Sequence, residues 1–154
     1  MIDTNIFLRL VFQEEGWERC GKLLDSVYSG RQEAIISAIQ ISELYTPFER
    51  AHDMEVRGKI SSEIKKSKIR IKKVDVEIAE LSARIRATEK TPGGNFLALA
   101  DSIILATALR ERVETLYTLD MDYSKVKSKV KISAPEMSIE EWHRMYALKK
   151  RLTP

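Results

Sequence analysis

Short apolar runs alternate with longer stretches of helical periodicity along this chain, and that alternation limits the folds open to it. We predict strands at 34–37 (AIIS), 69–76 (IRIKKVDV), 115–120 (TLYTLD) and 130–133 (VKIS). The main helical patterns lie at 38–53, 77–90, 97–112 and 138–151. Such an order is typical of a parallel sheet whose crossover helices cover both faces. The sequence therefore predicts an α/β fold.

Turn and capping residues mark where several of these helices begin or end. Ser37 with Gln40, and Ser138 with Glu141, have the spacing of capping boxes. The turn sequence TPGG at 91–94 separates two helical patterns. We therefore expect the first predicted strand to end, and its helix to begin, at Ser37.

One domain of ordinary size accounts for all 154 residues, because no internal repeat or long linker divides them. No apolar run approaches the ~20 residues of a membrane span, and no signal segment precedes Asp3. The single cysteine, Cys20, can form neither an internal disulfide nor a zinc site with a second cysteine. We therefore expect a cytoplasmic protein with no membrane partner.

Charge is distributed in four blocks of alternating sign. Residues 1–53 hold five Lys or Arg against nine Asp or Glu, and residues 91–124 hold two against five. Residues 54–90 hold eleven Lys or Arg against six acids, and residues 125–154 hold eight against three. Such blocks are either solvated faces or an acidic pocket with a basic rim, and a pocket of that kind suits a polyanion.

Several acids stand where the pattern calls for a core or turn residue. Asp3 follows only Met1 and Ile2, and Asp120 follows a predicted strand. Asp101 shares a helical stripe with apolar residues, and Glu43 flanks another such stripe. Taken singly, each acid can be a helix cap, a turn residue or a surface residue. In a parallel sheet, however, the strand ends at Asp3, Ser37 and Asp120 meet at one edge, where ligands bind.

Repulsion decides what a convergence of these acids requires. Two carboxylates ~4 Å apart at an effective dielectric near 20 repel by about 4 kcal/mol. Four of them must take up protons or bind a cation. Ligation by oxygen alone, without cysteine or histidine, favours Mg²⁺ or Mn²⁺ over zinc. These ions activate water and neutralise charge on a phosphodiester.

Four segments in order resemble the signatures of PIN-domain proteins: MIDTNIFLRL, ISAIQISELY, LALADSIILATAL and LYTLDMDY. The resemblance covers residues 1–134 and is greatest to the small ribonucleases of VapC type, the toxins of toxin–antitoxin pairs. It implies a three-layer α/β/α sandwich around a mostly parallel sheet of four or five strands. We accordingly expect a single PIN-like domain over residues 1–154, with a C-terminal helix at 138–151.

The resemblance also implies the site residues. The family's acidic positions, which bind the metal and carry catalysis, fall on Asp3, Glu43, Asp101 and Asp120. Supporting positions fall on Asn5, Thr118 and Asp122. Asp122 either binds the metal through water or caps the next helix, and we expect the cap.

One departure from the family concerns the first strand, because only Met1 and Ile2 precede Asp3. Family members have several apolar residues there. A strand this short gives up central-sheet hydrogen bonds worth ~1 kcal/mol each. Either the natural start lies upstream, or the strand is stunted and its sheet position is only partly filled.

The expected activity is metal-dependent endonucleolytic cleavage of RNA by an activated water molecule, with Mg²⁺ or Mn²⁺ as cofactor. The alternative is a PIN-fold RNA-binding module that is non-catalytic or processes RNA without a toxin role. Phosphate-binding loops of the type G-x-x-x-x-G-K-[ST] or G-x-G-x-x-G are absent. We expect an RNA substrate, a possible antitoxin protein and a homodimer.

Overall fold

The computed structural model describes residues 1–136, so the predicted C-terminal helix at 138–151 lies outside the described residues. The α-helices are α1 (Thr4–Val11), α2 (Trp17–Tyr28), α3 (Ala38–Arg50), α4 (Met54–Lys66), α5 (Val76–Thr88) and α6 (Leu99–Arg110). The strands are β1 (Ile35–Ser37), β2 (Arg70–Lys72), β3 (Thr115–Tyr117) and β4 (Lys131–Ser133), and η1 (Met121–Lys125) is a 3-10 helix.

The four predicted strands are present, but two are shorter than predicted. The predicted strand at 69–76 is only β2, because the Asp75 carboxylate accepts a hydrogen bond from the Ile78 N–H (3.0 Å) and begins α5. The predicted strand at 115–120 ends at Tyr117, and Asp120 caps η1. Capping by these two aspartates therefore starts each helical segment before the apolar pattern has ended.

All strand pairs are parallel, and the first residues of the chain join them. β1 pairs with β2 and β3 pairs with β4. Between the two pairs lies Ile2, which forms a single parallel bridge to Tyr117 and donates its N–H to the Ile35 carbonyl (3.2 Å). The arrangement is therefore β2–β1–Ile2–β3–β4, with a first strand as short as predicted.

A cavity lies beside the first residue of the chain. A cavity of about 470 Å³ is lined by Met1 and by residues at the start of β1 and β3, among them Glu33, Ile35 and Thr115. Gln40, which is fully buried, replaces part of the missing strand pairing: its side chain accepts from the Ser37 N–H (2.8 Å) and donates to the Ile2 carbonyl (2.9 Å). One amide side chain thus connects the first residues to the end of β1.

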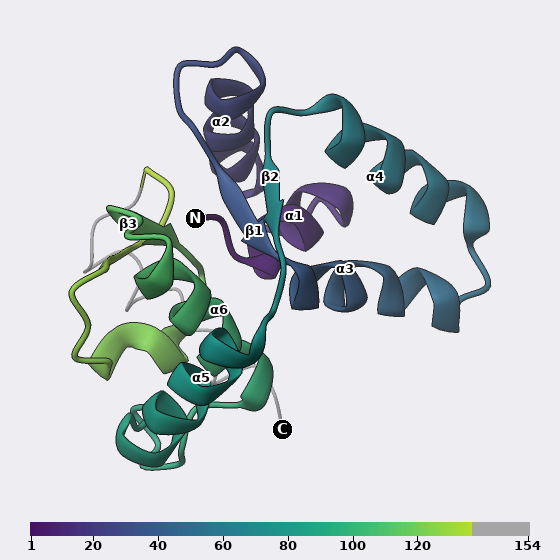
Figure 1. The fold of residues 1–154 in the computed structure, drawn as a ribbon. Helices are drawn as coiled ribbons and strands as arrows, with labels where there is room; N and C mark the ends of the chain where they lie inside the picture. Colours follow the sequence, from purple (N-terminus) through teal and green to yellow (C-terminus); the bar gives the residue numbers. More distant parts are fainter. Residues whose placement is uncertain (137–154) are drawn as a thin grey trace.

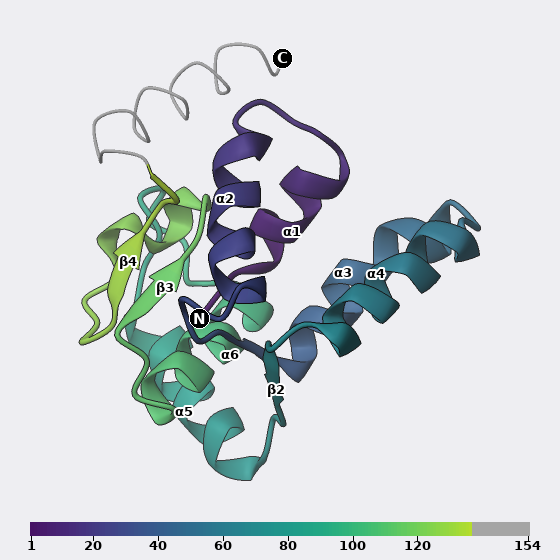
Figure 2. The same ribbon diagram turned by 90° about the horizontal axis from the view of Figure 1, so that it is seen from above.

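Two apolar clusters lie on opposite faces of the sheet and give the predicted three layers. Met1 and Ile35 belong to the cluster of α5 and α6, whereas Ile2 and Ile36 belong to the cluster of α1 to α4. Successive residues of a strand point to opposite faces, so both faces of this sheet are covered. Figures 1 and 2 show α5 and α6 on one side, and α3 with α4 extending from the other as a helical hairpin.

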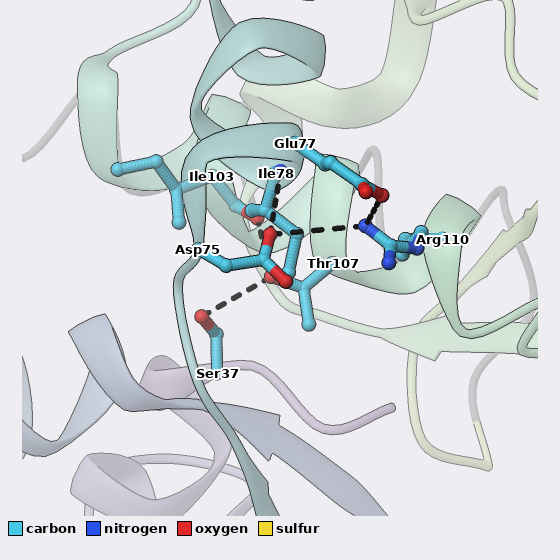
Figure 3. A network of polar contacts seen from close by, with 7 residues as sticks. All are labelled: Ser37, Asp75, Glu77, Ile78, Ile103, Thr107 and Arg110. Carbon is cyan, nitrogen blue, oxygen red and sulfur yellow. Dashed lines mark hydrogen bonds and ion pairs between the residues drawn. The ribbon is translucent and has the colours of Figure 1, made fainter.

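A polar network fixes α6 against α5 and β1 (Figure 3). Thr107 Oγ1 on α6 lies 3.2 Å from Ser37 Oγ at the end of β1, and both side chains are buried. Arg110, in the last turn of α6, pairs with Asp75 and Glu77 at the start of α5. Within residues 1–136 no helix has the length and apolar character that a membrane span requires.

Candidate metal centre

Asp3 is held in place by three neighbouring residues at the end of the Met1–Ile2 segment. Its Oδ1 accepts from the Thr4 N–H (2.7 Å), so Asp3 is also the N-cap of α1. Its Oδ2 accepts from Thr118 Oγ1 (2.6 Å) and Asn5 Nδ2 (2.8 Å). Asp3 is only 4% exposed. The sequence offered a helix cap and a site residue as alternative roles for Asp3, and in the structure one carboxylate can serve as both.

Asn5 and Thr118 connect Asp3 to the segment after β3. The Asn5 side chain accepts from the Leu119 N–H (3.1 Å) and donates to Thr118 Oγ1 (3.1 Å). Thr118 Oγ1 also accepts from the Asp120 N–H (2.9 Å). These contacts fix where Asp120 follows the strand, so two of the three predicted supporting residues, Asn5 and Thr118, connect Asp3 to the segment of Asp120.

Glu43 reaches the same region from α3. Its Oε2 accepts from Thr4 Oγ1 (2.7 Å), and Thr4 directly follows Asp3. The side chain is half-buried on the flank of α3. Glu43 is thus fixed next to Asp3 by a neutral hydroxyl rather than by a basic partner.

Asp101, Asp120 and Asp122 form the tightest acidic group. Each offers a carboxylate oxygen, and these oxygens all lie within 4.8 Å of one another. Asp101 lies in the first turn of α6, and the other two lie at the start of η1. Asp3 and Glu43 are not part of this 4.8 Å group, although their charges act on Asp101. Structure therefore separates the predicted acids into an inner trio and two neighbours.

The prediction that Asp122 caps the following helix is wrong. Asp120 is the cap, because its Oδ1 accepts from the Asp122 N–H (2.8 Å). Asp122 is the second residue of η1, and its half-buried carboxylate belongs to the acidic trio. In an Asp-x-Asp sequence either aspartate can cap the following turn, so the sequence pattern did not distinguish them.

Crowding and burial change the protonation of these acids. Burial raises the pKa of Asp101 to about 7, and the charges of Asp120, Asp3, Glu43 and Asp122 act in the same direction. Burial likewise raises the pKa of Asp3 to about 6, although the hydrogen bonds from Thr118 and Thr4 oppose the rise. Near neutral pH, therefore, the site holds excess negative charge that a cation would relieve.

Tyr123 is a site neighbour that sequence reasoning missed. Its hydroxyl donates to the Asp101 carbonyl (3.1 Å) and lies 3.5 Å from Asp101 Oδ1, and its ring is 1% exposed. Burial, together with the surrounding carboxylates, holds the pKa of Tyr123 well above its ordinary value. The phenol thus stays a neutral donor. Its only signal in the sequence was its position directly after Asp122.

The position of Asp101 depends on close packing of α5 and α6. Ser82 on α5 and Ser102 on α6 are both buried, and their hydroxyl oxygens lie 2.9 Å apart. Ser102 also donates to the Leu99 carbonyl (2.8 Å) in the first turn of its own helix. Small hydroxyl side chains let the two helices approach closely at the residue next to Asp101.

The residues present fit a hard divalent cation. The inner trio offers only carboxylate oxygens, and among residues 1–136 it is the group of acids, histidines and cysteine close enough to hold an ion. Carboxylates are the protein ligands that Mg²⁺ and Mn²⁺ prefer. No basic side chain is paired with Asp3, Glu43, Asp101 or Asp120 in a described ion pair.

Comparison with known proteins identifies the fold. The sequence model of the PIN domain matches residues 1–129. A toxin–antitoxin complex from Klebsiella pneumoniae contains a chain 24% identical, with a TM-score of 0.65 over 89% of this chain and 98% of that one. The VapBC2 complex of Rickettsia felis, bound to a promoter DNA fragment, gives 17% identity and 0.65 over 87% and 96%. FitAcB from Neisseria gonorrhoeae gives 25% and 0.65, also over 87% and 96%. No curated protein matches the chain.

Proposed function

The chain belongs to the PIN domain family, and from this premise we propose that it is a metal-dependent endoribonuclease, the toxin of a toxin–antitoxin pair. The substrate is RNA and the cofactor is Mg²⁺ or Mn²⁺. The active residues are Asp3, Glu43, Asp101 and Asp120, with Asp122 as a further ligand of the ion.

The observation that carries the proposal is the crowding of carboxylates at the carboxyl edge of the strands, where none of them has a basic partner among residues 1–136. Asp101, Asp120 and Asp122 place oxygens within 4.8 Å of one another, and the pKa of Asp101 rises to about 7. Acids that served only to stabilise the fold would be paired with basic side chains or solvated. This arrangement costs stability without a cation, which is typical of a site that binds one.

Each acid has a distinct task in this proposal. Asp101, Asp120 and Asp122 would hold the cation, while Asp3 and Glu43 would accept hydrogen bonds from water or from the substrate. When bound, a divalent ion lowers the pKa of water and neutralises charge on the phosphodiester. Water attacks phosphorus in line, and the bond to the 3′ oxygen breaks, leaving a 5′-phosphate and a 3′-hydroxyl.

The toxin role is supported by the kind of structures that share the fold. The matched K. pneumoniae chain comes from a toxin–antitoxin complex, and the R. felis chain comes from VapBC2 bound to a fragment of its promoter DNA. We propose that this chain likewise binds an antitoxin and forms a homodimer in the cytoplasm. Co-purification with the product of an adjacent small reading frame, and loss of RNA cleavage in that complex, are the expected results.

A cleavage assay tests the enzyme directly. The full chain is incubated with a panel of RNAs in Mn²⁺, in Mg²⁺ and with a chelator, beside Asp101→Asn and the control Glu80→Gln. Glu80 is an exposed acid on α5 outside the acidic group. We expect cleavage by the wild type and Glu80→Gln that the chelator abolishes, and none by Asp101→Asn. RNA binding that survives chelation without any cleavage would instead favour a non-catalytic RNA-binding module.

A further inference from the structure

An exposed aromatic side chain lies on the segment that leads into α6. Phe96 is 55% exposed, and Leu99, the first residue of α6, is 58% exposed. Exposed apolar side chains are common singly on protein surfaces, so it is the position of Phe96 and the groups around it that indicate a contact. The metal centre as described leaves both side chains without a role.

The segment that carries Phe96 is a hairpin with fixed geometry. Lys90 and Phe96 form an antiparallel bridge, and the Thr91 N–H donates to the Asn95 carbonyl (2.8 Å). Gly94 closes the turn with a φ of +84°, which favours glycine. Leu97 is fully buried, so the alternation of an extended chain turns the neighbouring Phe96 outward. The ring is therefore held in the exposed position.

This hairpin contacts the segment that bears two of the site acids. Lys125, the last residue of η1, places its Nζ 3.5 Å from the Pro92 carbonyl, and the Lys127 N–H donates to Glu89 Oε2 (2.9 Å). Four residues separate Phe96 from Asp101, and the last two of them lie in α6. Chain geometry limits their Cα atoms to a separation of roughly 14 Å. A short oligonucleotide can span that distance.

One cation lies over the Phe96 ring, and a second lies where the hairpin meets η1. Lys90 Nζ lies over Phe96 at 5.2 Å from the ring centroid, so it covers one face. Lys125 is exposed at the contact between hairpin and η1. An exposed aromatic ring beside one ammonium group, with a second lysine on the adjoining segment, suits single-stranded nucleic acid, because the ring can stack on a base and the cations can meet phosphates.

We propose that Phe96, with Lys90 and Lys125, forms a base-stacking subsite for single-stranded RNA beside the metal centre. The inference rests on the proposed function and adds to it a contact through which the protein holds an unpaired base. A base within a duplex has no free face for the ring, so double-stranded RNA gains nothing from this subsite. Phe96 acts in binding and positioning, and the acids alone carry the chemistry.

Binding measurements on uncleaved RNA separate this proposal from the nuclease itself. The full chain bearing Asp101→Asn binds a fluorescently labelled single-stranded RNA in Mg²⁺, and its affinity is compared with that of the same chain carrying Phe96→Ala, Phe96→Trp or Phe96→Leu. We expect about a tenfold loss with Ala and with Leu, and retention with Trp, because only an aromatic ring stacks. Retention with Leu, or no loss with Ala, overturns the proposal.

An abasic substrate identifies the contact. The base that meets Phe96 is found by replacing one nucleotide at a time with an abasic one. At that position we expect the abasic change to weaken binding to the protein with Phe96 but not to Phe96→Ala. If at every position the abasic change weakens binding to both proteins equally, the proposal is overturned. Tyr28→Ala, an exposed aromatic at the end of α2, is the matched control and keeps full affinity.

The same variants distinguish failure of the subsite from failure of the proposed function. If the wild type cleaves single-stranded RNA and Phe96→Ala raises KM about tenfold with kcat little changed, both hold. If the wild type cleaves and Phe96→Ala has the same KM, the subsite is wrong and the nuclease stands. If stacking is measured but no RNA is cleaved in any metal, the nuclease is wrong and the binding subsite stands. Loss of antitoxin binding instead of RNA binding in Phe96→Ala would assign the ring to a protein partner.

Discussion

The hydroxyl of Thr118 donates a 2.6 Å hydrogen bond to Asp3 Oδ2, joining residues 115 positions apart. Thr118 is fully buried, and the same hydroxyl accepts from the Asp120 N–H (2.9 Å). One side chain thus fixes the acid after the first strand relative to the acid after β3. The spacing of the site acids depends on this buried hydroxyl as much as on the sheet.

Thr118→Val is expected to weaken the fold and to move the pH dependence of cleavage. The change removes one of the three hydrogen bonds to the Asp3 carboxylate and the acceptor of the Asp120 N–H, so the free energy of unfolding falls by about 1–3 kcal/mol. The Thr118 hydrogen bond lowers the pKa of Asp3, so its loss raises that pKa further above about 6. The acidic limb of the kcat/KM profile then shifts to higher pH. Thr118→Ser, which retains the hydroxyl, keeps the wild-type profile; an unshifted limb in Thr118→Val would exclude this role.

Asp101→Asn is expected to stabilise the metal-free protein at neutral and alkaline pH. The folded-state pKa of Asp101, about 7, lies above its ordinary 3.8, so the folded form binds a proton that the unfolded form releases. This bound proton stabilises the wild-type fold. The stabilisation is complete below about pH 4 and is lost as the pH rises through about 7. At pH 8 the variant should exceed the wild type by about 1–3 kcal/mol in free energy of unfolding, and at pH 4 the gap should be small.

Urea unfolding in chelator at both pH values measures that gap. Comparing variant with wild type cancels the contribution of the Met1 amine, whose lowered pKa of about 6 gives a pH dependence of opposite sign. Added Mn²⁺ should stabilise the wild type and leave Asp101→Asn nearly unchanged. An equal gap at the two pH values contradicts the raised pKa.

Much of the fold could be read from the sequence because both sheet faces are buried by regular patterns. The runs at 34–37 and 130–133 became β1 and β4 almost as predicted, since each ends at a capping or turn residue. The long helix α2 was not predicted, because its apolar residues are interrupted by polar ones and Gly21. Strand lengths after Lys72 and Tyr117 were overestimated, since capping by Asp75 and Asp120 outweighs the apolar pattern.

The candidate site was only partly predictable, because sequence order carries no distances. Strand ends indicated that Asp3 and Asp120 meet, and the structure brings them together through Thr118. That Asp122, and not Glu43, joins the 4.8 Å group of Asp101 and Asp120 depends on the 3-10 turn of η1, for which the sequence had no distinct pattern. Tyr123 was hidden for the same reason.

Gln40 is expected to be essential for the join between Ile2 and β1. Its buried amide donates to the Ile2 carbonyl and accepts from the Ser37 N–H, so Gln40→Leu leaves two buried backbone groups unsatisfied. The free energy of unfolding should fall by about 2–4 kcal/mol in urea titration. Gln40→Glu keeps the acceptor and loses the donor, so it should be destabilising as well. Ser42→Ala, which changes an exposed residue on the same helix, is the control. If Gln40→Leu lowers the free energy of unfolding no more than Ser42→Ala does, water replaces the hydrogen bonds of Gln40.

Asp122 is expected to contribute more to cation affinity than Glu43 does. Asp122 offers an oxygen within 4.8 Å of those of Asp101 and Asp120, whereas Glu43 is outside that group and accepts from Thr4 Oγ1. Calorimetric titration with Mn²⁺ should therefore show a loss of about tenfold or more for Asp122→Ala and less than about threefold for Glu43→Ala. Glu80→Ala, which removes a remote acid of α5, should bind like the wild type. The reverse order would assign the cation to the four acids implied by family resemblance and leave Asp122 a structural residue of η1.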